Sequence, residues 1–256
     1  MSSPSDRQET PDFGPPLRQR GLVVRAAAPN EVPALIAMRA RAFRGGGTDE
    51  DAFDARCLHL WVGEDGAVPA TPLATARMQL HRAGEVAQGY TARYFDLTPL
   101  AAAPGPALEL GRLCTRPGPA APLALRMIWA GVARMVERTG AARLIGCSSF
   151  PGTDPADHAT VLAHLAAHHR GPDGRRPQAR PDVEHRPLTA WAEQAGPETV
   201  TPAQLPTLLR SYLSLGGWLG ADLVIDRDLG TCVAFTCVEI ATMPPRRRRV
   251  LTALAG

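Results

Sequence analysis

Runs of apolar residues and their spacing divide the chain into short strands and amphipathic helices. Continuous or alternating apolar stretches predict strands at 21–27, 58–62, 73–80, 108–115, 143–149, 221–226 and 232–240. Apolar positions at helical spacing predict helices at 30–44, 123–139, 155–169 and 205–215. This order of elements, without an internal repeat, predicts one α/β domain with a mixed sheet.

Cap and breaker residues indicate where these elements end. Asn30 is the expected N-cap of the first helix, and Gly140 is expected to end the second. Segments 48–57 and 170–187 are typical of loops, whereas the pattern of 88–103 assigns no element.

The two ends of the chain differ in composition from its middle. Residues 1–20 are polar and proline-rich, and we expect them to be disordered or loosely attached. Residues 243–256 contain four consecutive arginines, Arg246 to Arg249, and are expected to form a solvated basic tail. One folded domain is therefore expected over 21–242.

Composition narrows the classes of function. The hydrophobic fraction of 45% allows a sizeable core, and the formal net charge of +3 does not indicate a nucleic-acid partner. The 5 cysteines form no C-x-x-C pair, so neither a disulfide framework nor a zinc site is expected. His164 and His168 could share a helix face, but without a third ligand we expect no metal site.

The sequence also predicts where the protein is located. The first residues lack the apolar core of a signal peptide, and no apolar run approaches the ~18 residues that cross a bilayer. We therefore expect a cytoplasmic protein. The arginine run could bring it to anionic lipid at the periphery of the inner membrane.

The most informative segment is the predicted strand at 108–115 with the Pro/Gly-rich loop and long helix that follow. The N-terminus of a helix presents unpaired N–H groups and the positive end of the helix dipole, which together favour an anion. A plain crossover connection that binds nothing is the alternative. Neither reading is decided by this feature alone.

Several short motifs add a family resemblance. In order, they are the stretches at 39–44 (RARAFR), 51–60 (DAFDARCLHL), 90–97 (YTARYFDL), 109–112 (ELGR), 146–154 (GCSSFPGTD) and 212–218 (YLSLGGW). Together they resemble the GCN5-related N-acetyltransferases and, more closely, the ornithine acyl-carrier-protein N-acyltransferases of ornithine-lipid synthesis. The resemblance extends over residues 22–240. A more distant likeness is to acyl-homoserine-lactone synthases, which share the Asp-x-x-Asp and Glu-x-x-Arg patterns.

The resemblance implies a fold, a reaction and partners. The fold would be the α/β, GCN5-related N-acetyltransferase-like mixed sheet flanked by helices. The reaction would move a 3-hydroxy fatty acyl group from acyl carrier protein to the α-amine of L-ornithine, giving lyso-ornithine lipid. No bound cofactor is expected, because the donor is carried on the phosphopantetheine of the carrier protein. The partners would be that protein and the amino acid.

One departure bears on the acyl donor. Coenzyme-A-dependent members of the fold carry glycines before the helix, where backbone N–H groups approach a pyrophosphate. Here the loop at 116–122 contains Pro117, Pro119 and Pro122, which lack that donor. The loop therefore favours the single phosphate of phosphopantetheine over coenzyme A.

N-acylation needs a neutral amine, so a group must remove a proton from the ammonium. Glu109 is the expected base, and a buried ion pair with Arg112 is its alternative role. An i, i+3 pair in an extended strand points to opposite faces, so that pair would need a bulge. Burial would raise the pKa of Glu109 and a nearby arginine would lower it, and the sequence does not decide between them. Arg112 could instead bind the substrate carboxylate through its bidentate fork.

The remaining candidates would shape the substrate site. Asp51 and Asp54 could face the second amine of ornithine, or could lie in a solvated loop. Arg77 lies within an apolar strand, so its charge requires a partner. The family pattern places Arg41, Phe43 and Ser149 around the substrate.

Three other functions remain open. They are a coenzyme-A-dependent N-acetyltransferase acting on another amine, an acyl-homoserine-lactone synthase, and a non-catalytic module that binds carrier protein or lipid. A hydrolase built on the 147–149 segment is disfavoured, because the sharp Gly-x-Ser-x-Gly turn is absent.

Overall fold

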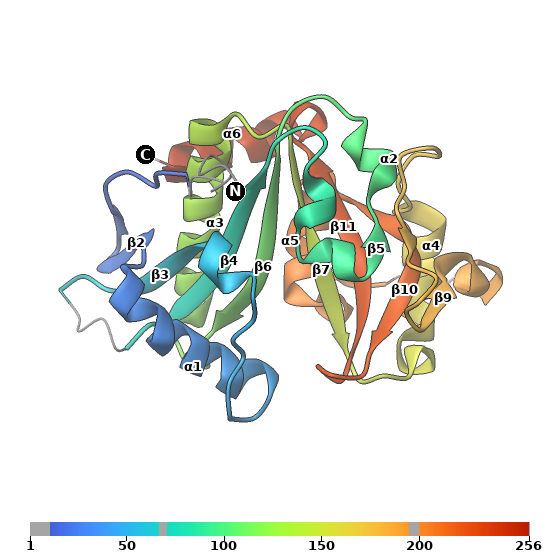
Figure 1. Cartoon of the computed structure of the whole chain (residues 1–256), viewed down its shortest axis with the longest axis horizontal. Helices are drawn as coiled ribbons and strands as arrows, with labels where there is room; N and C mark the ends of the chain where they lie inside the picture. The colour runs from blue at the N-terminus through green and yellow to red at the C-terminus, as the bar shows by residue number, and fades with distance from the viewer. Residues whose placement is uncertain (1–10, 67–70, 195–199, 256) are drawn as a thin grey trace, which may run out of the picture. The chain divides into compact units, whose positions relative to one another are not determined.

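The computed structural model describes residues 11–66, 71–194 and 200–255, and these form two compact units (Figure 1). The first unit contains the described residues of Met1–Leu80, Leu110–Gly140 and Leu251–Gly256. The second contains those of His81–Glu109 and Ala141–Val250. One of the changes from unit to unit, between Glu109 and Leu110, falls inside the strand predicted at 108–115.

The sheet of the first unit is built from strands that follow one another along the chain. Its strand order is β1-β2-β3-β4-β6, and the pairs β1–β2, β2–β3 and β3–β4 are antiparallel. The strands are β1 (Leu17–Gln19), β2 (Leu22–Ala26), β3 (Leu58–Glu64), β4 (Ala74–His81) and β6 (Ala107–Thr115). The last residue of β4 and the first three of β6 are assigned to the second unit.

Helix α1 (Val32–Phe43) covers one face of this sheet. Its buried Leu35 forms a hydrophobic cluster with Val23 of β2 and Trp61 of β3. The strand register places Val23 and Trp61 on the same face, because Val23 pairs with Gly63, two residues from Trp61.

Helix α3 (Ala121–Thr139) covers the opposite face, and it ends at Gly140 as the sequence predicts. Gly131 of α3 lies against Leu60 and Val24, the strand residues next to those that contact α1. Alternation of side chains along a strand therefore places the two helices on opposite faces.

In the second unit the strands β7, β11, β10 and β9 lie side by side in that order, and each neighbouring pair is antiparallel. The strands are β7 (Arg143–Pro151), β11 (Thr231–Glu239), β10 (Trp218–Asp226) and β9 (His185–Pro187). The closing hairpin expected at the end of the domain is β10–β11. The segment 170–187, expected to be a loop, also forms β9 and the short β8 (Gln178–Ala179), which pairs with β5 (Phe95–Asp96).

Each face of this second sheet buries its own apolar cluster. Ala234 of β11 belongs to the cluster formed with α4 (Ala159–His168) and α5 (Thr207–Ser214). Phe235, the next residue, belongs to the cluster formed with residues 86–101. Ala107 of β6 is part of the second cluster, so the start of β6 joins the face covered by that segment.

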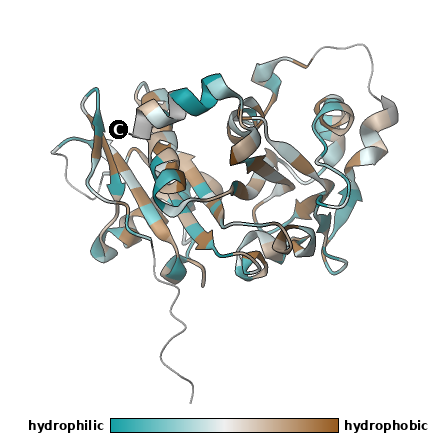
Figure 2. Cartoon of the chain, turned by 90° about the horizontal axis from the view of Figure 1, so that it is seen from above, coloured by the Kyte–Doolittle hydropathy of each residue, from teal (hydrophilic) through white to brown (hydrophobic). Residues whose placement is uncertain are grey.

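Three sequence-based expectations are corrected. Residues 11–20, within the segment expected to be disordered, include β1 and the buried Phe13, which is 1% exposed; residues 1–10 lie outside the described residues. Residues 243–256, expected to be a tail, contain helix α6 (Pro245–Ala255), whose start is hydrophilic (Figure 2). Asn30 lies inside a short 3-10 turn, and Glu31 is the N-cap residue of α1.

The unassigned segment 88–103 is structured by short elements. It contains the 3-10 turn Thr91–Arg93, strand β5 and the one-turn helix α2 (Thr98–Ala101). No helix in the described part of the chain is long and apolar enough to span a bilayer.

We predict that Gly131→Leu destabilises the protein. A Cβ added at Gly131 would already lie 3.0 Å from a methyl group of Leu60, so a larger side chain must displace the sheet residues beneath α3. The expected loss is about 1–3 kcal/mol in the free energy of unfolding, measured by chemical denaturation. Glu137→Leu, at an exposed position of the same helix, is the control and should change little. Equal stability of the two variants would contradict the packing described here.

Candidate active site

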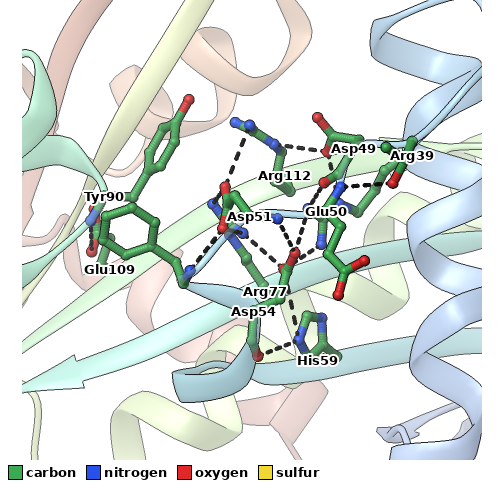
Figure 3. A network of polar contacts seen from close by, with 12 residues as sticks. Arg39, Asp49, Glu50, Asp51, Asp54, His59, Arg77, Tyr90, Glu109 and Arg112 are labelled. Atoms are coloured by element: carbon green, nitrogen blue, oxygen red, sulfur yellow. Dashed lines mark hydrogen bonds and ion pairs between the residues drawn. The ribbon is translucent and has the colours of Figure 1, made fainter.

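The main candidate in the second unit is the buried carboxylate of Glu109, near the start of β6. Glu109 is 5% exposed, and four hydrogen-bond contacts surround its two oxygens. Oε1 accepts from Thr91 N at 2.6 Å and from Thr91 Oγ1 at 2.5 Å. Oε2 accepts from Tyr90 N at 3.1 Å and lies 2.9 Å from Nε2 of His81 (Figure 3 shows Tyr90 and Glu109). The carboxylate thus has a partner for each of its lone-pair directions.

These partners come from one stretch of chain that turns around the carboxylate. His81 ends β4, and Tyr90 and Thr91 are the N-cap and first residue of the 3-10 turn Thr91–Arg93. Burial raises the pKa of Glu109, but the contacts from His81 and Thr91 outweigh it and hold the pKa below its usual value. Glu109 is therefore ionised at neutral pH.

A second set of hydrogen bonds links Tyr90 to the sheet of the same unit. The Tyr90 and Tyr94 hydroxyls are 2.9 Å apart, and the Tyr94 hydroxyl donates to Asp226 Oδ2 at 2.7 Å. Burial, followed by the contact with Tyr90, raises the pKa of Tyr94. Since Tyr94 donates its only proton to Asp226, the Tyr90 hydroxyl is the donor between the two rings.

The first unit contains a polar feature of its own, a network of buried ion pairs (Figure 3). Arg39 of α1 is 1% exposed. Its guanidinium contacts Asp49 Oδ2 at 2.9 Å and Asp54 Oδ1 at 2.6 Å. Without these two carboxylates a buried guanidinium would be costly, so the network fixes the loop at 48–57 against the helix.

Two strand arginines complete the network. Arg77 of β4 contacts Asp51 Oδ1 at 2.6 Å and Asp54 Oδ1 at 2.8 Å. Arg112 of β6 contacts Asp49 Oδ2 at 2.9 Å. Each of the three aspartates therefore meets at least one arginine.

These arginines keep the aspartates ionised. Burial tends to raise the pKa of Asp54, but hydrogen bonds from Arg39 and Arg77 lower it to about 2. Burial also opposes ionisation of Asp51, and Arg77 again lowers the pKa of that carboxyl. The network consequently holds fixed charges of both signs at neutral pH.

Comparison with known proteins gives the family. Residues 36–130 match a domain model described as an acetyltransferase (GNAT) domain. An L-ornithine N(alpha)-acyltransferase of Rhodobacter capsulatus is 32% identical over 80% of this chain and 79% of its own length. The chain belongs to the L-ornithine N(alpha)-acyltransferase family. A Brucella abortus relative with the same name is 30% identical over 77% of this chain and 72% of its own length.

Membership of this acyltransferase family confirms the expected fold class, a GNAT-type mixed sheet flanked by helices, and makes the chain an acyltransferase. Among solved structures, the N-acyl amino acid synthase FeeM from uncultured soil microbes is similar. It is 14% identical, with 91% of this chain and 98% of that chain covered and a TM-score of 0.41. The acyl-homoserine-lactone synthase LasI is 13% identical, with 84% and 89% covered and a TM-score of 0.39.

The structure groups some candidates of this acyltransferase and separates others. The partner expected for Arg77 is confirmed as Asp51 and Asp54. The alternative of a solvated loop for Asp51 and Asp54 is wrong, because both carboxylates pair with arginine. Glu109 and Arg112 each have partners other than those expected, and β6 is bent at Arg112, where φ is 51°.

The candidates expected to shape the substrate pocket differ in exposure. Arg41 is exposed on α1 and Ser149 is exposed on β7. Phe43 is half-buried, with the Arg112 guanidinium 6.0 Å from the centre of its ring. The buried arginine of α1 is therefore Arg39 rather than Arg41.

Several residues of the site were missed by sequence reasoning. Arg39 carried a usable signal, because it lies on the apolar face of its helix and a charge there requires a partner. Asp49, His81 and Thr91 carried none, since each is one polar residue among many and gains its role from residues that fold against it.

We predict that Arg39→Met destabilises the protein by about 3–5 kcal/mol, because it leaves Asp49 and Asp54 buried with fewer cationic partners. Arg41→Met, two residues along the same helix and exposed, is the matched control. Chemical denaturation at neutral pH measures both. A similar small effect of the two substitutions would show that the buried pairs contribute little.

The depressed pKa of Asp54 also predicts a pH dependence of stability. A carboxyl with a pKa lower in the folded than in the unfolded state stabilises the fold above the unfolded value of about 3.9. That contribution is lost as the pH falls toward the folded value of about 2. Asp54→Asn should therefore lower the free energy of unfolding at neutral pH. Between the unfolded and folded pKa values, the stability of this variant should fall less steeply with pH than that of wild type. Asp157→Asn, at an exposed position, should leave the acid limb of the stability curve unchanged.

Proposed function

We propose that this acyltransferase moves a 3-hydroxyacyl group from the thioester of acyl carrier protein to the α-amine of L-ornithine. The product would be lyso-ornithine lipid. The relatives in Rhodobacter capsulatus and Brucella abortus, both named L-ornithine N(alpha)-acyltransferase, support the acceptor and the bond that is made. The names of these relatives do not specify the acyl chain or its carrier, so both are part of the proposal.

The buried, ionised carboxylate of Glu109 is the observation that carries the proposal. Its partners are backbone N–H groups, a hydroxyl and an imidazole, none of which carries a fixed positive charge. The carboxylate therefore keeps a negative charge that can attract the ammonium group of an amino acid and accept its proton.

The bond changes follow from this role. Glu109 takes a proton from the ammonium, and the freed nitrogen lone pair attacks the thioester carbonyl carbon. The new N–C bond forms and the C–S bond breaks. The nitrogen gives up its second proton, the departing thiolate takes up one proton to leave as the carrier thiol, and Glu109 releases the other to solvent. Neither a metal nor a redox cofactor is needed to balance these steps.

Within the ion-pair network we propose that Asp51 meets the second amine of ornithine. Its side chain is 17% exposed, whereas the side chain of Asp54 is 7% exposed. Arg112, bent out of regular strand geometry, is proposed to bind the substrate carboxylate, with Phe43 beside it. Arg77 would act through Asp51, by holding it in place.

The loop before α3 supports acyl carrier protein as the donor rather than coenzyme A. The first N–H of the helix, from Ala121, donates to Gly118 O, and Pro122 at the next position has none. Few N–H groups therefore remain to bind the pyrophosphate of coenzyme A. Phosphopantetheine carries a single phosphate, which needs fewer donors. Arg246–Arg249, exposed at the start of α6, are proposed to contact the acidic carrier protein.

We predict that Glu109→Gln lowers acyl transfer by about 100-fold or more, the usual contribution of a positioned base. Glu137→Gln, at an exposed position of α3, should keep wild-type turnover. Product is measured by mass spectrometry with purified protein, 3-hydroxyacyl carrier protein and L-ornithine. Wild-type turnover by a folded Glu109→Gln variant would remove this carboxylate from the reaction.

The choice of donor separates the proposed reaction from the other functions. Wild-type protein is given acetyl-coenzyme A or 3-hydroxyacyl carrier protein, each with L-ornithine, with and without S-adenosylmethionine. We expect product with 3-hydroxyacyl carrier protein as the donor, whether or not S-adenosylmethionine is present, and none with acetyl-coenzyme A. A requirement for S-adenosylmethionine would indicate a lactone synthase, and binding of carrier protein without product would indicate a non-catalytic module.

A further inference from the structure

His81 is the one imidazole in contact with the proposed base, and no family motif drew attention to it. It is 0% exposed, and its Nε2 lies 2.9 Å from Glu109 Oε2. Its other ring nitrogen, Nδ1, is buried and has no hydrogen-bond partner among the described residues. A fully buried polar ring with one unpaired nitrogen is expensive to keep, so its single contact requires an explanation.

The two ring nitrogens of His81 have different surroundings. Glu109 is ionised and can only accept, so Nε2 of His81 donates the hydrogen bond between them. Nδ1 is buried without a hydrogen-bond partner among the described residues. The contact with Glu109 is therefore what holds the ring in place on its polar side.

Backbone packing fixes this pair in place. A Cβ added at Gly89 would lie 2.2 Å from Glu109 Oε2 and 2.8 Å from His81 Nε2. The main chain therefore passes directly over the contact, and any other residue would push the two groups apart. Residues 89–91 thus close one side of the carboxylate while His81 holds it from β4.

We propose that His81 is a positioning residue for acyl transfer, which holds Glu109 as a carboxylate turned toward the substrate amine. This inference rests on the proposed function, because it assigns His81 a role through the base of that reaction. His81 itself does not touch the substrate. Among the described residues, it supplies the one side-chain N–H that contacts Glu109.

The arrangement has a definite consequence for the pH dependence of activity. The base works only when ionised, so activity falls as the pH drops through its pKa. Without the His81 N–H, burial is opposed by fewer donors and the pKa of Glu109 rises. The acidic limb of the pH profile must then move to higher pH.

Three other titratable side chains lie near His81 and Glu109. Tyr90 faces it from the 3-10 turn and Cys147 of β7 approaches the Thr91 hydroxyl. Tyr212 of α5 interacts electrostatically with Glu109, and burial raises the pKa of that tyrosine. None of these groups donates to the carboxylate through a titratable atom, so they should not reproduce the effect of changing His81.

The test compares His81→Leu, which removes the donor, with His81→Gln, whose amide N–H has a similar reach. In His81→Leu the acidic limb of kcat/KM should move up by about one pH unit or more, and in His81→Gln by less. His185→Gln, on β9 of the same unit, is the control and should keep the wild-type profile. A uniform loss of kcat/KM at every pH, with the limb in place, would show a merely structural role and overturn the proposal.

A second measurement does not depend on turnover. Isotope-edited infrared spectroscopy follows ionisation of the Glu109 carboxyl in the free protein, with the band assigned by its loss in Glu109→Gln. Titration at the same pH in wild type and His81→Leu would overturn the inference, whatever the reaction. If wild type forms no acyl-ornithine from carrier protein while the band shifts as expected, the proposed function fails and the link between His81 and Glu109 stands.

Discussion

The second unit is arranged around one constraint, which is that the carboxylate of Glu109 must be buried without losing its charge. An ionised carboxylate removed from water is costly unless donors replace the water. Four donors do so, and all belong to His81, Tyr90 and Thr91. The short 3-10 turns of this region, which present consecutive N–H groups on one side, follow from that requirement. The close passage of Gly89 is part of the same arrangement.

The first unit meets a similar constraint in a different way. Its two buried aspartates, Asp49 and Asp54, are matched by guanidinium groups, and the single carboxylate of Asp49 contacts three of them, from Arg39, Arg44 and Arg112. Such a network brings little net stability compared with apolar packing, but removing one member leaves an uncompensated charge. It therefore specifies how the loop at 48–57 meets α1 and the strands. The left-handed φ of Arg112 is maintained within this network, where its side chain pairs with Asp49.

Periodicity predicts the elements well because each strand and helix buries one face along its length. The apolar spacing of 123–139 predicted α3, and the charge of Arg77 in an apolar run predicted an ion pair. The sequence could not predict which residues form ion pairs over long distances along the chain. No local pattern links Arg77 to Asp51, which is 26 residues away. Strand β1 was missed because the tight turn at Arg20 and Gly21 lacks the usual asparagine. The segment 88–103 was unassigned because its elements, of three, two and four residues, are too short to show a period.

The contrast between the two kinds of buried carboxylate bears on which one can do chemistry. Asp54 is neutralised by Arg39 and Arg77, which stay protonated, and its pKa of about 2 leaves it little tendency to take a proton at neutral pH. Glu109 is stabilised by backbone N–H groups, a hydroxyl and an imidazole, with no arginine among these four contacts, so no permanently charged partner cancels its negative charge. An incoming ammonium is attracted to the uncancelled charge, and a donor such as the Thr91 hydroxyl can rotate away as the proton arrives. A carboxylate held without arginine is therefore suited to transient protonation, whereas one held by arginine is suited to permanent structure.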